Sequence, residues 1–333
     1  MKKWYARALI AIFLGMCLIP MRTLALDPHA IEESFYPRGR LIAWTSNLRL
    51  AIGDRVFPKV IAGDDGWLVY TAENDIDDYQ KIGLFSDEQL AVFQQNLDAL
   101  SEAYAERGIE LIVVIAPNKN TIYPERVPVQ IPVLGNESRL DQVISYLRAN
   151  GNEQIVDLRP ALLAAKHERQ MYYATDTHWN DYGAYIAYAA LLEAAGIEPR
   201  PQSDFDPATR EPGLLDLSDN IGATILPESK IQFAPLFDLR ASFKNLNLGG
   251  RRLMLSYVRD DSLPDLVMYY DSFFFNVIPL LGEHFHHGLY VQNYTGGGLW
   301  NLSWVDERQP DVVIIEFAER YLHDLPDFID PNR

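Results

Sequence analysis

The stretch Leu111-Ile112-Val113-Val114-Ile115-Ala116 decides the fold class of this chain. Every residue in it is apolar, most are β-branched, and Pro117 follows directly. A strand that is apolar on both faces is typical of the interior of a parallel sheet that helices cover on both sides. We therefore expect an α/β fold with a central, mostly parallel sheet.

Helical patterns alternate with further strand patterns around this stretch. Ser86 and Gln89 have the spacing of a capping box, apolar residues follow at helical spacing, and Gly108 closes the helix. Asn180 is a candidate N-cap for a later helix. The alternation predicts right-handed crossovers and helices on both faces of the sheet. The expected helices span about 86–108, 139–149, 181–195 and 273–285, with another beginning near 160, and the expected strands span 67–70, 111–116, 154–158, 266–270, 289–291 and 312–316.

Composition limits the class of protein. The chain has 333 residues with 29 Lys and Arg against 46 Asp and Glu, a formal net charge of -17, and 48% of its residues are hydrophobic. Such a chain can bury a large core in one large domain or two ordinary ones. Its acidity argues against a nucleic-acid partner and against bulk attraction to a polyanionic substrate, because phosphate binding needs a basic face.

The N-terminus has the pattern of an export signal. Lys2, Lys3 and Arg7 precede an apolar run at 8–21, and small residues follow around Ala25. Basic, apolar and small-residue regions in this order are typical of a secretory signal. The run is shorter than the roughly 20 residues that span a bilayer, although a short uncleaved anchor stays open as an alternative. We expect an exported protein that is periplasmic or extracytoplasmic, with anchoring through this segment left open.

The domain organisation follows from these patterns. We expect a signal peptide or short anchor at 1–25, an irregular or helical segment at 26–60, and the catalytic domain at 61–333, with an insertion at about 197–260 that is rich in Pro, Asp and Gly. The single cysteine, Cys17, lies in the apolar run. A chain cleaved after that run would have no structural disulfide, thiolate zinc site or cysteine nucleophile.

Two short motifs could carry chemistry. Asp176 and His178 are two residues apart in Thr175-Asp176-Thr177-His178-Trp179-Asn180, so in an extended segment their side chains can share one side. A carboxylate beside an imidazole can hold one nitrogen's proton and leave the other nitrogen as a base. The alternative is that Asp176 only caps the next helix and His178 is a packed polar residue.

The second motif is Asp271-Ser272-Phe273, where a buried strand meets a helix. A serine at the carboxyl edge of a sheet lies beside backbone N–H groups that can stabilise an oxyanion. The alternative is that Asp271 or Ser272 simply caps the helix. Because a serine hydroxyl needs a base, we predict a triad of Ser272 as nucleophile, His178 as base and Asp176 as its orienting carboxylate.

Weaker candidates lie on neighbouring loops. Asn118 and Lys119 follow a buried strand and could donate to an oxyanion or a substrate hydroxyl, and Asn293 could reach the site from the loop after the last-but-one strand. Each of these residues is also consistent with an ordinary solvated loop or turn. The histidine-rich stretch 283–287 has neither His-Glu-x-x-His spacing nor a cysteine, so we expect no metal and no cofactor.

Several segments carry a resemblance to one known family. They are Gly63-Asp64-Asp65-Gly66-Trp67-Leu68, Ala116-Pro117-Asn118-Lys119, Tyr123-Pro124-Glu125, the Asp-Thr-His-Trp-Asn run, Asp271-Ser272-Phe273, Pro310-Asp311-Val312-Val313-Ile314 and Glu319-Arg320. Together they resemble the SGNH-hydrolase-like domain of the alginate O-acetyltransferase family of AlgX and AlgJ. The resemblance implies a flavodoxin-like, three-layer α/β/α fold and a Ser-His-Asp triad, with Asp176 and His178 matching the family's Asp-x-His pair and Ser272 its nucleophile. The family's usual small residue before Asp-Ser is Tyr270 here.

The resemblance implies an exported O-acetyltransferase that acts on an exopolysaccharide through an acyl-enzyme. A carbohydrate O-acetylesterase stays open, because both reactions share the first half-reaction. A non-catalytic polysaccharide-binding or scaffold protein of a biosynthetic complex is the other alternative. The expected partners are a polysaccharide acceptor and an acetyl donor, with a membrane-bound acetyl-transfer partner left open and no nucleic acid.

Overall fold

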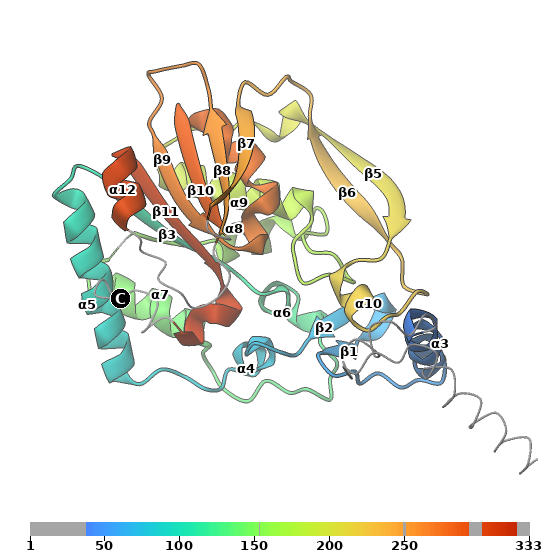
Figure 1. The fold of residues 1–333 in the computed structure, drawn as a ribbon. Helices are drawn as coiled ribbons and strands as arrows, with labels where there is room; N and C mark the ends of the chain where they lie inside the picture. The colour runs from blue at the N-terminus through green and yellow to red at the C-terminus, as the bar shows by residue number, and fades with distance from the viewer. Residues whose placement is uncertain (1–37, 153, 249–250, 293–301, 325–333) are drawn as a thin grey trace, which may run out of the picture.

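A seven-stranded sheet forms the centre of the molecule (Figure 1). The computed structural model describes residues 38–324 except residue 153 and the segments 249–250 and 293–301. The four pairings from β4 to β10 are parallel, and the two pairings that add β8 and β7 are antiparallel. The α/β class with a mostly parallel sheet is therefore confirmed. In spatial order the strands are β4 (Ile155–Asp157), β3 (Glu110–Ala116), β11 (Val312–Ala318), β9 (Leu266–Tyr270), β10 (His287–Gln292), β8 (Arg251–Tyr257) and β7 (Ser242–Leu248).

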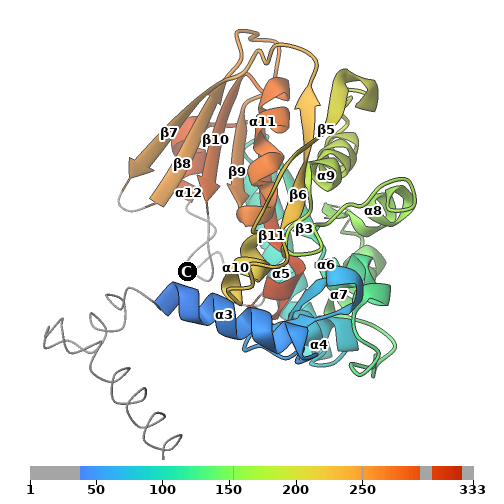
Figure 2. The same ribbon diagram turned by 90° about the vertical axis from the view of Figure 1, so that its right-hand side faces the viewer.

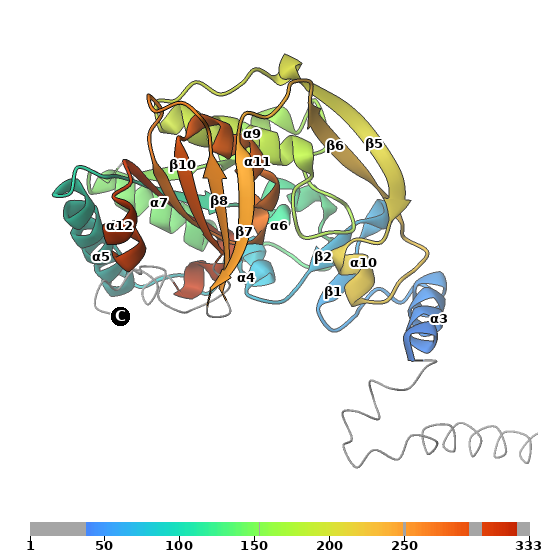
Figure 3. The same cartoon turned by 45° about the horizontal axis from the view of Figure 1, so that its top comes forward.

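Helices cover both faces of this sheet and produce three layers, as Figure 3 shows from a second direction. On one face pack α5 (Asp87–Ala105), α7 (Arg139–Ala149) and α12 (Leu302–Arg308). On the other pack α8 (Arg159–Ala165), α9 (Asp181–Ala194) and α11 (Ile278–Leu281). The side chains of β3 alternate between the two cores, Val113 toward α5 and Val114 toward α9, which explains why this strand is apolar on both faces.

The predicted helix beginnings are present. Ser86 accepts the Gln89 N–H and the Gln89 side chain accepts the Ser86 N–H, which completes the capping box of α5. The Asn180 side chain accepts the N–H groups of Tyr182 and Gly183 at the beginning of α9. The cap of α9 matters for the site, because it fixes where the Asp176–His178 loop ends.

The helix expected over 273–285 is broken. A 3-10 turn at Ser272–Asn276 is followed by α11 and by a second 3-10 turn at Gly282–His284. Pro279 lies in the first turn of α11 and has no N–H to donate backward, so one continuous helix cannot pass through it.

The segment at about 197–260, expected as one insertion, divides into two parts. Its first part is an antiparallel pair, β5 (Phe205–Gly213) and β6 (Glu228–Pro235), with α10 (Asp216–Asn220) between the strands. Its last part is β7 and β8, which extend the central sheet. The polar, exposed side chains of β7 suit an edge strand, and this polarity hid the strand in the sequence.

A small third core lies beside the sheet. Residues of β1 (Val60–Ala62), β2 (Leu68–Tyr70) and α10 form it, and Leu50 of α3 (Arg38–Ala51) packs against it. Figure 2 shows α3 on the outside of this region. The predicted signal or anchor at 1–25 lies outside the described residues. The remaining short helices are α4 (Asp75–Gln80), α6 (Lys119–Ile122) and the 3-10 turns Asp64–Gly66, Pro124–Arg126, Gln202–Asp204 and Glu319–Asp324.

Across the described residues, none of the helices has both the length and the apolarity needed to cross a bilayer.

Candidate active site

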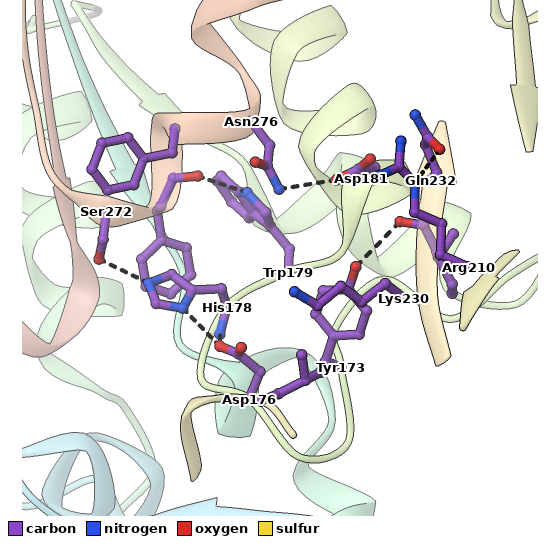
Figure 4. Close-up of a pocket in the computed structure, with 14 residues that line it drawn as sticks. Tyr173, Asp176, His178, Trp179, Asp181, Arg210, Lys230, Gln232, Ser272 and Asn276 are labelled. Carbon is purple, nitrogen blue, oxygen red and sulfur yellow. Dashed lines mark hydrogen bonds and ion pairs between the residues drawn. The ribbon is translucent and has the colours of Figure 1, made fainter. Parts of the chain in front are cut away.

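The structure brings the three predicted triad residues together (Figure 4). The Ser272 Oγ lies 2.8 Å from the His178 Nε2, and the His178 Nδ1 lies 2.7 Å from the Asp176 Oδ1. With Asp176 ionised, the Nδ1 proton points to its carboxylate and Nε2 is free to accept the Ser272 hydroxyl proton. Residues 94 positions apart in the sequence thus form a continuous path for a proton.

The loop that carries Asp176 and His178 is held from both sides. The buried Lys119 ammonium donates to the backbone carbonyls of Tyr173, Ala174 and Asp176 at 3.3, 3.1 and 2.6 Å. From β6, the Glu228 carboxylate accepts the N–H groups of Ala174 and Thr175 at 2.9 and 2.7 Å. A loop tied at this many backbone atoms holds its imidazole in one orientation without further ordering, which favours catalysis.

The nucleophile lies in a turn that is hydrogen-bonded to the end of β11. The Asp271 Oδ1 accepts the Phe273 N–H at 2.8 Å, and its Oδ2 accepts the Ala318 N–H at 2.8 Å. Asp271 therefore is the cap, and Ser272 remains available to His178. Ser272 begins the 3-10 turn Ser272–Asn276, and backbone N–H groups at such a beginning can stabilise an oxyanion.

A contact between Trp179 and Phe273 joins the two motifs. The Trp179 indole N–H donates to the Phe273 carbonyl at 2.8 Å, and the Phe273 ring lies 4.9 Å from the His178 ring between centroids. Both Trp179 and Phe273 are buried. This packing fixes the base loop relative to the nucleophile turn.

Asp216 is a site residue that the sequence analysis missed. Its Oδ2 lies 3.7 Å from the His178 Nδ1, and its carboxylate accepts the N–H and the hydroxyl of Thr177 at 2.9 and 2.6 Å. Burial, followed by the charge of Asp176, raises the pKa of Asp216 to about 6. Burial alone would raise the pKa of Asp176 too, but hydrogen bonds from His178 lower it to about 2.

These two carboxylates titrate in different pH ranges. Asp176 stays ionised and can stabilise the imidazolium that forms when Ser272 loses its proton. Asp216 titrates close to the working range and lies at the beginning of α10, in an irregular stretch with no local motif. No sequence signal pointed to it, because it reaches His178 only through the tertiary fold.

The same cluster has the residue types that can hold a metal ion. One ligand atom each from Asp176, His178 and Asp216 lies within 4.8 Å of the others. In the triad, however, Nδ1 of His178 carries the proton that bonds to Asp176, and a protonated nitrogen cannot ligate a metal. The hydrogen bonding favours proton transfer at this position.

A cavity of about 520 Å³ opens over the triad. Asp176, His178 and Ser272 form one wall (Figure 4). The β5–β6 arm, residues 205–235, forms the opposite wall through Arg210, Lys230, Ile231 and Gln232. The cavity therefore has a reactive side and a side with two cations, Arg210 and Lys230, which interact with the Asp181 carboxylate that also lines the cavity.

The weaker candidates lie elsewhere. Lys119 and Asn118 are buried and are not among the cavity-lining residues, because Lys119 is bound to the loop carbonyls and the Asn118 N–H donates to Glu319 at 2.8 Å. Asn293 lies outside the described residues. Tyr270 is buried, with its ring 5.6 Å from the Phe275 ring, so the core accommodates this large residue before the nucleophile.

The three-layer sheet with a serine, a histidine and an aspartate at its carboxyl edge defines an SGNH-hydrolase-like α/β domain. Comparison with known proteins agrees. The family described as the SGNH hydrolase-like domain of the acetyltransferase AlgX matches residues 60–212, which contain Asp176 and His178. The predicted resemblance to the AlgX and AlgJ family is thereby confirmed.

Relatives by sequence carry the name probable alginate O-acetylase AlgJ. The protein of Pseudomonas syringae pv. tomato is 31% identical over 188 residues, which cover 54% of this chain and 45% of that protein. The protein of Azotobacter vinelandii is 29% identical over 183 residues, which cover 53% of this chain and 44% of that protein. This chain thus spans less than half the length of these relatives.

Solved structures show the same fold. PatB1 of Bacillus cereus with a sulfonyl adduct has a TM-score of 0.58 at 14% identity, covering 81% of this chain and 99% of that chain. The O-acetyltransferase domain of Pseudomonas putida AlgJ has a TM-score of 0.50 at 21% identity, covering 80% of this chain and 92% of that chain. At these identities the likeness establishes the fold alone.

Proposed function

We propose that this chain is an exported O-acetyltransferase that moves acetyl groups onto an exopolysaccharide through an acyl-enzyme. The observation that carries the proposal is the hydrogen-bonded path from the Ser272 Oγ through His178 to Asp176, at 2.8 and 2.7 Å, at the wall of an open cavity. The AlgX and AlgJ relatives support acetyl transfer as the reaction.

The chemistry has two halves. His178 takes the hydroxyl proton of Ser272 as the oxygen attacks the acetyl carbonyl of the donor, and the Ser272 N–H faces the oxyanion that forms. The donor's alcohol leaves with the proton from His178, and the acetyl group remains on Ser272. A sugar hydroxyl then loses its proton to His178, attacks the acetyl-serine ester, and releases Ser272 when His178 returns the proton.

The cationic wall indicates the kind of acceptor. Arg210 and Lys230 are exposed on the β5–β6 arm and line the cavity opposite Ser272. Two cations at this place suit an acceptor that carries carboxylates, as alginate does. We propose an acidic polysaccharide as the acceptor. The other proposed partners are an acetyl donor and a membrane-bound acetyl-transfer protein that meets this chain in the periplasm.

Ester turnover and product mass test this function. The wild type should release p-nitrophenol from p-nitrophenyl acetate and gain about 42 Da, one acetyl group, on Ser272. Ser272→Ala should lose both, while Ser262→Ala, an exposed surface serine, should keep both. Equal background rates in wild type and Ser272→Ala would instead support the scaffold alternative.

A second measurement separates the transferase from the esterase. The acetylated enzyme is mixed with acidic or neutral oligosaccharides, and the masses of the products are measured by mass spectrometry. An oligosaccharide heavier by about 42 Da means transfer to the sugar. Free acetate alone, at a rate that added oligosaccharide does not change, means hydrolysis and contradicts the transferase.

A further inference from the structure

Helix α3 carries an apolar stripe that faces away from the protein. Leu41, Trp44 and Leu48 lie at helical spacing on it, and Ile52 continues the line just after its end. These side chains are 47, 66, 45 and 73% exposed. Residues three, seven and eleven positions apart lie on one side of a helix, so this is one continuous face.

The opposite face of α3 makes the contacts with the protein. The buried Ser46 hydroxyl donates to the Ile221 carbonyl, and Asn47 exchanges two hydrogen bonds with Thr224, at 2.7 and 3.0 Å. Leu50 packs against the small third core. A helix of a soluble protein normally turns its apolar side inward, and α3 instead turns polar groups inward and its largest apolar groups outward.

Charge around α3 differs from that of the remaining chain. Residues 26–50 contain three Lys or Arg and three Asp or Glu, whereas residues 51–333 contain 22 and 43. The helix itself contains three arginines and no acidic residue, with Arg49 paired to Asp54 at 2.6 Å. The apolar stripe thus lies on a helix whose own charges are all basic, in a chain that is otherwise strongly acidic.

We propose that α3 lies in the headgroup region of an anionic lipid bilayer, with the Leu41, Trp44, Leu48 and Ile52 stripe toward the acyl chains. A helix with Trp and Leu on one side, and arginines on the chain beside it, is typical of a segment bound in the membrane plane. The apolar run at 8–21 lies 16 residues before α3 in the sequence, so both membrane-seeking segments belong to one stretch of chain.

The consequence for the molecule is orientation. The inner face of α3 contacts Ile221 and Thr224, which directly follow α10. The first residue of α10 is Asp216, which faces His178. Docking through α3 therefore turns the α10 side of the domain toward the bilayer, whatever reaction the site performs.

The test uses the full chain with a local probe, since the apolar run at 8–21 could hold every variant on vesicles. In a Cys17→Ser background, single cysteines are introduced by Leu48→Cys, Ile52→Cys and, as the control, Val129→Cys, and each is labelled with an environment-sensitive fluorophore. Val129 is 88% exposed and lies away from α3 in the sequence. Vesicles contain phosphatidylethanolamine and phosphatidylglycerol, with or without lipids brominated near the top of the acyl chain.

The expected result is a blue shift at positions 48 and 52 on adding vesicles, with quenching by the brominated lipids, because an interfacial helix buries its apolar face about 5–10 Å into the headgroup boundary. Position 129 should change in neither respect. Replacing phosphatidylglycerol with phosphatidylcholine should weaken the quenching. The proposal is overturned if the labels at 48 and 52 stay unquenched. It is also overturned if the blue shift occurs without vesicles and the protein has a doubled mass, because a second copy of the chain then covers the stripe.

Discussion

Replacement of Asp176 by asparagine tests how much the carboxylates of Asp176 and Asp216 each stabilise the His178 imidazolium. At an effective dielectric constant near 20, an imidazolium is attracted to a carboxylate at 2.7 Å by about 6 kcal/mol and to one at 3.7 Å by about 4.5 kcal/mol. In Asp176→Asn, Asp216 loses the neighbouring charge that raises its pKa and becomes more fully ionised at pH 7. Because its pKa of about 6 already leaves it mostly ionised at pH 7 in the wild type, Asp216 keeps its own attraction to the imidazolium but does not take over that of Asp176.

The expected cost is therefore large. The variant loses the nearer carboxylate, whose attraction of about 6 kcal/mol is an upper figure because water screens the partly exposed pair. A loss of about 4–5.5 kcal/mol lowers kcat for p-nitrophenyl acetate by about 10³–10⁴-fold. The double variant Asp176→Asn with Asp216→Asn has no carboxylate beside Nδ1, and it should lose about another 10–100-fold, since water screens part of the second charge.

Stopped-flow or plate-reader ester kinetics at pH 7 measure these losses, with circular dichroism to verify folding. Asp219→Asn is the matched control, because Asp219 lies on α10 and is exposed. A double variant no slower than Asp176→Asn would refute the contribution of Asp216. An Asp176→Asn variant with more than about a tenth of the wild-type rate would refute the role of Asp176 as the orienting carboxylate.

Three further substitutions have defined outcomes. Arg210→Gln with Lys230→Gln should raise KM for an acidic oligosaccharide about tenfold, because two exposed ion pairs are lost, and should leave p-nitrophenyl acetate turnover unchanged; equal KM values would exclude an acidic acceptor. Glu228→Gln leaves one backbone donor of the Asp-His loop unpaired and should lower the free energy of unfolding by about 1–3 kcal/mol in urea titrations. An unchanged urea midpoint would contradict the role of Glu228 in holding this loop. Burial lowers the pKa of His284 to about 4, so the unfolded chain binds the proton first as the pH falls from 6.5. The free energy of unfolding should therefore drop by about 2–3 kcal/mol between pH 6.5 and 4. The drop should be smaller in His284→Gln.

The parts of the fold that sequence could predict are those with a local cause. The apolar strand at 111–116 and the cap at Ser86 depend on neighbouring residues only, and both are found where expected. The edge strand β7 was hidden, because its side chains are mostly polar and its place in the sheet depends on pairing with β8. The break after Ser272 follows from Pro279, which has no backbone N–H to continue a helix.

The residues of the candidate site also differ in whether a local sequence motif points to them. Asp176, His178 and Ser272 stood out because each lies in a compact motif at a strand or helix boundary. Asp216 has no such motif, and only the packing of α10 brings it to His178. Lys119 was a candidate because it follows a buried strand, but its ammonium is buried and donates to three backbone carbonyls, so its observed contacts hold the loop.

The β5–β6 arm has a consequence for how such enzymes change substrate. It is a two-stranded sheet separate from the central one, yet its outer residues Arg210, Lys230 and Gln232 form a wall of the cavity. The strands at 205–213 and 228–235 could therefore be exchanged with those of related enzymes to change the lining of the cavity, while α10 between them is kept because its Asp216 lies beside His178. Such a graft must also keep Glu228, because its carboxylate holds the loop that carries the base.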